Sequence, residues 1–220
     1  MEFVKEIKFN NRNPQNISLL KTLDNLSANP TTIVEKGEKF FRCRVVNNDL
    51  DKVDVDKNFK GYNEKGSFVT PREKASDMRA NYRFIPYLYV ASSEKIAMLE
   101  TRPKDVSLVS VANIVVCEEL TLFDLRKTKE LSDHSRNVKD NFLIDLAELY
   151  SKPVDTNDDQ IDYVPTQYIA EYIKNLDYDG IIYPSTKGKD KYKDYNIVIF
   201  NYEKCRAKSS KLKIFKKGEV

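Results

Sequence analysis

The sequence has few cysteines and histidines, the residues that stabilise small proteins through disulfides or bound metals, and it is also poor in glycine and tryptophan. The 220-residue chain has three cysteines, one histidine, six glycines and no tryptophan. Cys43, Cys117 and Cys205 are far apart and form no C-x-x-C pair, which argues against a disulfide framework and a zinc knuckle. We therefore expect no metal site and a chain that works in a reducing compartment, the cytoplasm.

Long apolar runs and a strong excess of one charge are also missing. No run of 18 apolar residues could cross a membrane, and the first residues do not have the pattern of a secretory signal. The net charge of +3 is too small to indicate a nucleic-acid binder. The most basic stretch, 204–217, could contact a phosphate backbone, but a solvated end strand and tail explains it more simply.

The common catalytic signatures are absent as well. The chain has no G-x-G-x-x-G, G-x-x-x-x-G-K-[ST], H-E-x-x-H or G-x-S-x-G motif, and six glycines are too few for an elaborate phosphate-binding loop. A Ser-His or Cys-His nucleophile would depend entirely on His134, which lies in charged text and which we interpret as a loop residue.

What the chain does contain is a normal globular mixture, with 40% hydrophobic and 32% charged residues, rich in Tyr and Phe. The apolar pattern predicts many short strands and a few unevenly placed helices. Because the two do not alternate strictly, an α+β fold on a split, mostly antiparallel sheet fits better than an α/β fold. The expected strands are 40–46, 86–91, 106–116, 120–125, 180–183 and 196–202, with 211–215 as a further edge, and the expected helices are 94–101, 140–150 and 165–176.

The length favours one large domain. We place a catalytic domain at residues 39–220 and, before it, an N-terminal extension at residues 1–38 that packs on or near the domain. The extension is polar and turn-rich around one short helical candidate, 18–26.

Several polar residues occupy positions that structure alone explains poorly. Arg42 and Arg44 alternate out of an otherwise apolar strand and so share one face, although a half-exposed edge strand would also account for them. Arg79 lies just before a buried strand. Glu100 lies near the end of a short helix, where the helix dipole disfavours a negative charge. Ser185 follows a strand, in a position typical of ligand-facing loops.

In this order these segments resemble the RES-domain family, which is named for an Arg, a Glu and a Ser. The central match is Arg79-Ala-Asn81, followed by Ile85 to Ala91 and by Ile96-Ala97 through Glu100-Thr-Arg-Pro103. Upstream, Phe40 to Arg44 resembles the opening strand of the family, and downstream Asp179 to Ser185 resembles its Ser loop.

The resemblance covers roughly residues 39–202 and includes two departures from the family pattern. Met78 replaces the usual Gly before the central Arg, and Asn81-Tyr-Arg-Phe84 replaces the usual Asn-Pro-x-Gly turn. We therefore expect the loop over the ligand to differ in shape from that of its relatives.

The resemblance implies an ADP-ribosyltransferase-like fold and an enzyme that consumes NAD+. Characterised members are often toxins of toxin–antitoxin pairs, and they release nicotinamide with inorganic phosphate or with water as the acceptor. It thus implies an NAD+ phosphorylase or an NAD+ glycohydrolase with NAD+ as substrate, no cofactor, and phosphate as a candidate co-substrate. It also suggests an antitoxin partner, and it is compatible with a homo-oligomer.

The chemistry assigns the catalytic roles to Glu100, Arg79 and Tyr89. Nicotinamide leaves as a neutral group and needs no general acid, whereas the oxocarbenium-like transition state is stabilised by a carboxylate beside the ribose. Glu100 is the candidate, acting through its charge or by holding a ribose hydroxyl. Tyr89 would form an aromatic wall for nicotinamide.

The remaining residues would bind substrate. The pyrophosphate requires planar cationic donors, which suits Arg79 together with one of Arg42 and Arg44. Ser185 would hydrogen-bond a phosphate or ribose oxygen, and Asn81 belongs to the same matched segment as Arg79.

Two other functions remain open. The same fold could transfer ADP-ribose to a protein or a nucleic acid. Alternatively, the chain could be a non-catalytic module that binds nucleic acid or protein, for which the basic C-terminal stretch and the unmatched N-terminus are the only support.

Overall fold

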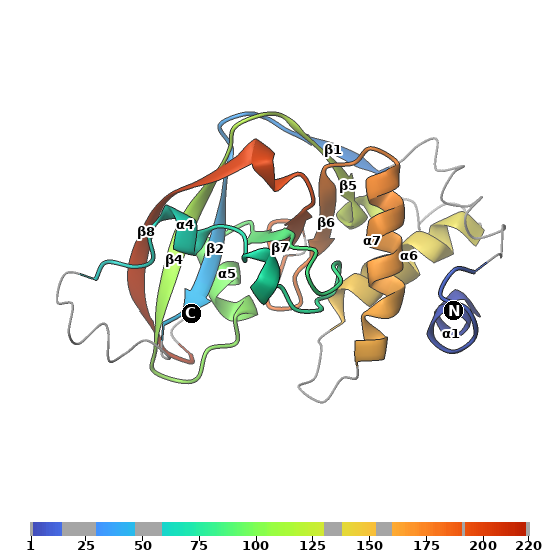
Figure 1. The fold of residues 1–220 in the computed structure, drawn as a ribbon, viewed down its shortest axis with the longest axis horizontal. Helices are drawn as coiled ribbons and strands as arrows, with labels where there is room; N and C mark the ends of the chain where they lie inside the picture. Colours follow the sequence, from blue (N-terminus) through green and yellow to red (C-terminus); the bar gives the residue numbers. More distant parts are fainter. Residues whose placement is uncertain are drawn as a thin grey trace.

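The chain folds around one eight-stranded sheet in a computed structural model that describes residues 2–14, 30–46, 59–129, 138–152, 160–190 and 192–218 (Figure 1). The strand order is β1-β5-β6-β7-β3-β2-β4-β8, and every neighbouring pair is antiparallel except β5 with β6. This arrangement confirms the α+β class and the mostly antiparallel sheet. The strands are β1 (Thr31–Val34), β2 (Lys39–Val45), β3 (Leu88–Ala91), β4 (Ser107–Val116), β5 (Leu120–Asp124), β6 (Gly180–Pro184), β7 (Tyr195–Ile199) and β8 (Cys205–Phe215).

The sheet is split between β2 and β3. These strands share a single residue pair, Phe41 with Ala91, whereas every other neighbouring pair of strands shares at least three. The β2-β4-β8 half and the β1-β5-β6-β7-β3 half therefore meet at a narrow backbone junction (Figure 1). Few backbone hydrogen bonds between strands fix the relative position of the two halves, so contacts between side chains must also fix it.

The helices divide between the two halves. Contacts of α4 (Glu64–Ser67) and α5 (Glu94–Glu100) include β2 and β4, whereas α6 (Val138–Ser151) and α7 (Val164–Asn175) pack against β6 (Figure 1). Ser93 begins α5 as its N-cap, because its hydroxyl accepts a hydrogen bond from the Ile96 amide at 3.2 Å. No described helix is long and apolar enough to span a membrane.

Both faces of the larger half are covered by apolar side chains. In β6, Ile181 packs in the cluster that includes α6 and α7, while Ile182 is buried in a second cluster on the other face. Val198 and Ile197 of β7 alternate in the same way. A strand buried on both faces is apolar at nearly every position, which explains why these strands are recognisable in the sequence.

Two elements differ from the sequence prediction. β1 lies within the predicted N-terminal extension, yet it pairs with β5 as an edge of the same sheet. β8 begins at Cys205, well before the predicted edge at 211–215, because the basic stretch pairs with β4 along its whole length. The helical candidate 18–26 and His134 lie outside the described residues.

The loop that replaces the family's Asn-Pro-x-Gly turn adopts a left-handed backbone conformation. Met78 and Asn81 close a tight turn through two backbone hydrogen bonds, of 3.0 and 3.3 Å. Phe84 then has a φ of 69°, which glycine accepts and other residues rarely adopt. Phe84 therefore takes the left-handed conformation for which glycine is usually required.

Replacing Phe84 by glycine and by alanine tests this conformation, because both changes remove the half-exposed ring. We expect Phe84→Gly to be more stable than Phe84→Ala by about 1 kcal/mol, since only alanine retains the Cβ that is strained at positive φ. Denaturant unfolding of the two variants measures the difference. An alanine variant as stable as the glycine variant would show that Phe84 is not left-handed in solution.

Candidate active site

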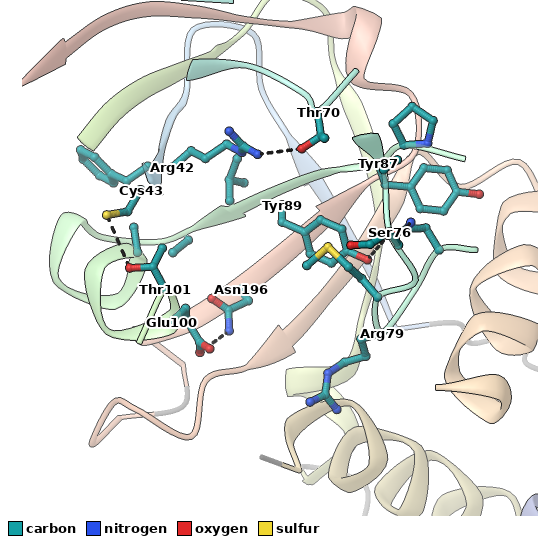
Figure 2. A pocket seen from close by; sticks show the side chains of 18 of the residues that line it. Arg42, Cys43, Thr70, Ser76, Arg79, Tyr87, Tyr89, Glu100, Thr101 and Asn196 are labelled. Carbon is teal, nitrogen blue, oxygen red and sulfur yellow. Dashed lines mark hydrogen bonds between the residues drawn. The ribbon is translucent and has the colours of Figure 1, made fainter. Parts of the chain in front are cut away.

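A cavity of about 650 Å³ lies where the two halves of the sheet meet (Figure 2). Its volume falls within the usual range for small-molecule sites. β2, β3, β6 and β7 contribute to its walls, together with α5 and the loop before β3. The polar and aromatic side chains that line it include Arg42, Arg79, Tyr87, Tyr89, Glu100, Tyr183 and Asn196.

Glu100, the last residue of α5, is held on one side of the cavity by two side chains. Its Oε1 accepts hydrogen bonds from Ser185 Oγ at 2.6 Å and from Asn196 Nδ2 at 2.7 Å. Both donor residues are only 7% exposed, whereas Glu100 itself is exposed, so buried donors hold a carboxylate that solvent and ligands can reach. Within the described part of the chain, Oε2 has no hydrogen-bond partner. The carboxylate is thus fixed by one oxygen and offers the other.

Ser185, predicted to hydrogen-bond a phosphate or ribose oxygen, holds the Glu100 carboxylate in the structure. It does not line the cavity, and its hydroxyl proton is donated to Glu100. Since a hydroxyl has one proton, Ser185 cannot also donate to a phosphate or ribose oxygen. Asn196, the second donor, is not among the predicted site residues, although a polar residue within a strand that is otherwise apolar was a signal for it.

Arg79 lies in the Met78–Asn81 turn, on the cavity wall near α6 (Figure 2). Its guanidinium donates hydrogen bonds to the carbonyl oxygen of Leu149 at 2.6 Å and to that of Lys152. These carbonyls belong to the C-terminal end of α6, where a cation is favoured by the helix dipole. The cation is therefore oriented before any ligand binds.

Asn81 and Tyr89 hold this turn in place. The Asn81 side chain, 1% exposed, donates to the carbonyls of Ser76 and Tyr82, both at 3.0 Å, and accepts from the Tyr89 hydroxyl at 2.7 Å. That hydroxyl also accepts from the Ala80 amide at 3.1 Å. Burial raises the pKa of Tyr89, which keeps the phenol neutral. Asn81 thus shapes the loop, while Tyr89 presents its ring to the cavity.

Gln167 of α7 also holds the Met78–Asn81 turn in place. Its side-chain amide donates to the carbonyls of Met78 at 3.0 Å and Asn81 at 2.9 Å, and the residue is buried. Sequence reasoning missed this residue because, on a helix with several polar side chains, nothing marked it as facing inward.

Only one of the two arginines on β2 reaches the cavity. Arg42 lines it, whereas Arg44 stacks on Tyr62, 4.4 Å from the ring centroid, and donates to the Gly66 carbonyl. The prediction that one of Arg42 and Arg44 binds the ligand therefore now applies to Arg42. Alternation along the strand correctly placed both on one face, but the loop that contains Tyr62 and Gly66 captures Arg44.

Arg42 is a largely buried cation without an anionic partner in the described residues. It donates only to the Ser67 carbonyl at 3.3 Å and to Thr70 Oγ1 at 3.4 Å (Figure 2). Burial, followed by the charge of Arg44, lowers the pKa of Arg42 to about 10. Burying a charge without an opposite charge beside it is costly. A bound anion would supply the missing partner.

The cavity has no activated thiol. Cys43 lines it, but burial raises the pKa of this thiol to about 11, so it remains protonated at neutral pH. Thr101 Oγ1 contacts its sulfur at 3.7 Å. Among the described residues, no group of three or more His, Cys, Asp or Glu side chains could hold a metal ion. The chemistry on offer is that of a carboxylate facing cationic donors.

Comparison with known proteins identifies the family of this chain. A family model described as the RES domain matches residues 55–215. A solved structure described as the M. tuberculosis MbcT-MbcA toxin-antitoxin complex is 15% identical, with a TM-score of 0.45 over 90% of this chain and 92% of that chain. No curated protein matches the sequence.

Adding inorganic pyrophosphate to the purified protein tests the anion site at Arg42. At about a hundredfold excess over its Kd, pyrophosphate should raise the free energy of unfolding by about 2.7 kcal/mol. We expect Arg42→Met to lose this gain and Arg44→Met, the neighbouring arginine outside the cavity, to keep it. Thermal unfolding at constant ionic strength measures both. Equal responses of the two variants would contradict the assignment.

Proposed function

Because this chain belongs to the RES-domain family, we propose that it cleaves the bond between nicotinamide and ribose in NAD+ by phosphorolysis or hydrolysis. Its role would be that of a toxin or defence effector that depletes cellular NAD+. The observation that carries this proposal is the Glu100 carboxylate, held by Ser185 and Asn196 through one oxygen with the other left for a ligand.

The position of Glu100 suits departure of nicotinamide. As the glycosidic bond breaks, positive charge develops on the ribose, and a carboxylate that is already oriented stabilises it without reorganisation. Ser185 and Asn196 provide that orientation. Nicotinamide leaves as a neutral molecule, so the reaction does not require a histidine or another general acid in the cavity.

The two arginines suit the pyrophosphate of NAD+. Arg42 contributes a cation without an anionic partner among the described residues, and Arg79 contributes a guanidinium already oriented by α6. Planar guanidinium groups bind phosphate oxygens in pairs, which favours them over lysine for this purpose. The ring of Tyr89 would pack against nicotinamide.

An antitoxin protein is the partner we propose for this enzyme. The loop beside the cavity exposes several large apolar side chains, namely Met78, Tyr82, Phe84 and Ile85. Met78 also lines the cavity itself. Exposed apolar side chains gathered at a cavity are typical of a protein-binding surface. A partner seated on them would block access to Glu100.

Replacement of Glu100 by glutamine tests the catalytic assignment. Glu100→Gln keeps the size of the side chain and removes its charge, so we expect NAD+ consumption to fall by roughly a hundredfold or more. Glu94→Gln is the matched control, because Glu94 lies on the same helix but pairs with Lys213 outside the cavity. Consumption by Glu100→Gln at the rate of the unchanged protein would refute the role of Glu100.

Product analysis separates the reactions. We expect ADP-ribose 1″-phosphate when phosphate is the acceptor and ADP-ribose when water is, measured by chromatography of incubations with and without phosphate. Transfer of label from biotinylated NAD+ to a macromolecule would instead favour an ADP-ribosyltransferase. Intact NAD+ together with steeply salt-dependent binding to DNA or RNA would favour a non-catalytic module.

A further inference from the structure

The hydroxyl of Tyr183 is a buried polar group without a hydrogen-bond partner among the described residues. Tyr183 is 8% exposed, and its ring packs against that of Tyr150, with centroids 5.6 Å apart. Three other tyrosines of this region all have partners. The hydroxyls of Tyr87, Tyr89 and Tyr150 donate to Glu171, Asn81 and the Thr166 carbonyl, each at 2.7 Å. Because buried polar groups are nearly always paired, the exception needs an explanation.

The side chain of Tyr183 faces the cavity beside Glu100. Tyr183 on β6 is paired in register with Asn196 on β7, and both residues line the cavity. Directly opposed residues of antiparallel strands project to the same face of the sheet. Asn196 binds Glu100 at 2.7 Å, so Tyr183 emerges next to the residue that fixes the carboxylate.

Burial and the charges of Arg79 and Glu100 act on the phenol of Tyr183. Burial and the negative charge of Glu100 raise its pKa, and the positive charge of Arg79 opposes them. The phenol therefore stays neutral at working pH. A neutral hydroxyl both donates and accepts, and so complements a sugar hydroxyl, whereas phosphate oxygens that only accept are matched by the guanidinium groups.

We propose that the Tyr183 hydroxyl hydrogen-bonds a hydroxyl of the nicotinamide ribose beside the unpaired Glu100 oxygen, making Tyr183 a further substrate-binding residue. This inference rests on the proposed function. The described residues offer the phenol no hydrogen-bond partner, and a bound ribose would supply one. The contact holds the ribose so that its reacting carbon faces the carboxylate.

Tyr183→Phe removes the hydroxyl and keeps the ring. We expect kcat/KM for NAD+ to fall roughly tenfold to a hundredfold, because a ribose hydroxyl is left unpaired in the cavity. The melting temperature should be unchanged or higher, since the lost hydroxyl forms no hydrogen bond to the residues that the structure describes. Tyr168→Phe is the control, as Tyr168 packs against Phe3 outside the cavity, and its kcat/KM should match that of the unchanged protein.

Two dinucleotides that lack either the 2′ or the 3′ hydroxyl of the nicotinamide ribose identify the contact. For the one lacking the contacted hydroxyl, Tyr183→Phe and the unchanged protein should differ less than about twofold, while the loss persists for the other. Comparing substrates within one preparation cancels differences in the amount of folded protein.

Each alternative result overturns the contact. Equal losses on all three dinucleotides would show that Tyr183 does not contact a ribose hydroxyl. Full activity of Tyr183→Phe on NAD+, or failure of this variant to fold, would also contradict the proposal. If the unchanged protein does not consume NAD+, the proposed function fails first and this inference fails with it. Consumption of NAD+ without the expected pattern overturns the Tyr183 contact alone.

Discussion

The hydrogen bonds that Ser185 and Asn196 donate to Glu100 tie together parts of the molecule that the backbone joins weakly. Glu100 ends a helix that packs on β2, whereas its two donors come from β7 and from the loop after β6. The two halves of the sheet share one residue pair, so a charged acceptor with two buried donors contributes substantially to their alignment. The same bonds that complete the fold also orient the carboxylate.

The strands and helices that the sequence predicts are those with a strong apolar pattern. β4, β6, α5 and α7 are recognisable because their buried positions recur at the period of the element or run continuously. β1 is absent from the sequence prediction, and β8 is shortened in it. β8 is mostly Lys, Ser and Arg, residues that avoid burial, and the pairing with β4 that makes it a strand lies far away in the chain.

For the candidate site, the sequence identifies residue types but not their partners. Alternation places Arg42 and Arg44 on one face, yet a loop from another part of the chain decides which one reaches the cavity. Ser185 lies 85 positions from Glu100, and Asn196 lies 96 positions from it. No local pattern encodes bonds of that span. That Ser185 and Asn196 both donate to Glu100 therefore became visible only in three dimensions.

The hydrogen bonds of Arg79 connect the cavity wall to the C-terminal end of α6, a helix that lies far away in the sequence. A guanidinium has five N–H groups, and two of those of Arg79 donate to α6 carbonyls, which leaves three for an anion. A ligand bound by the remaining N–H groups would be connected to α6 through the Arg79 side chain. If Arg79 binds the ligand, thermodynamic reciprocity requires that whatever free energy the last turn of α6 contributes to ligand binding is returned by the bound ligand as stabilisation of that turn.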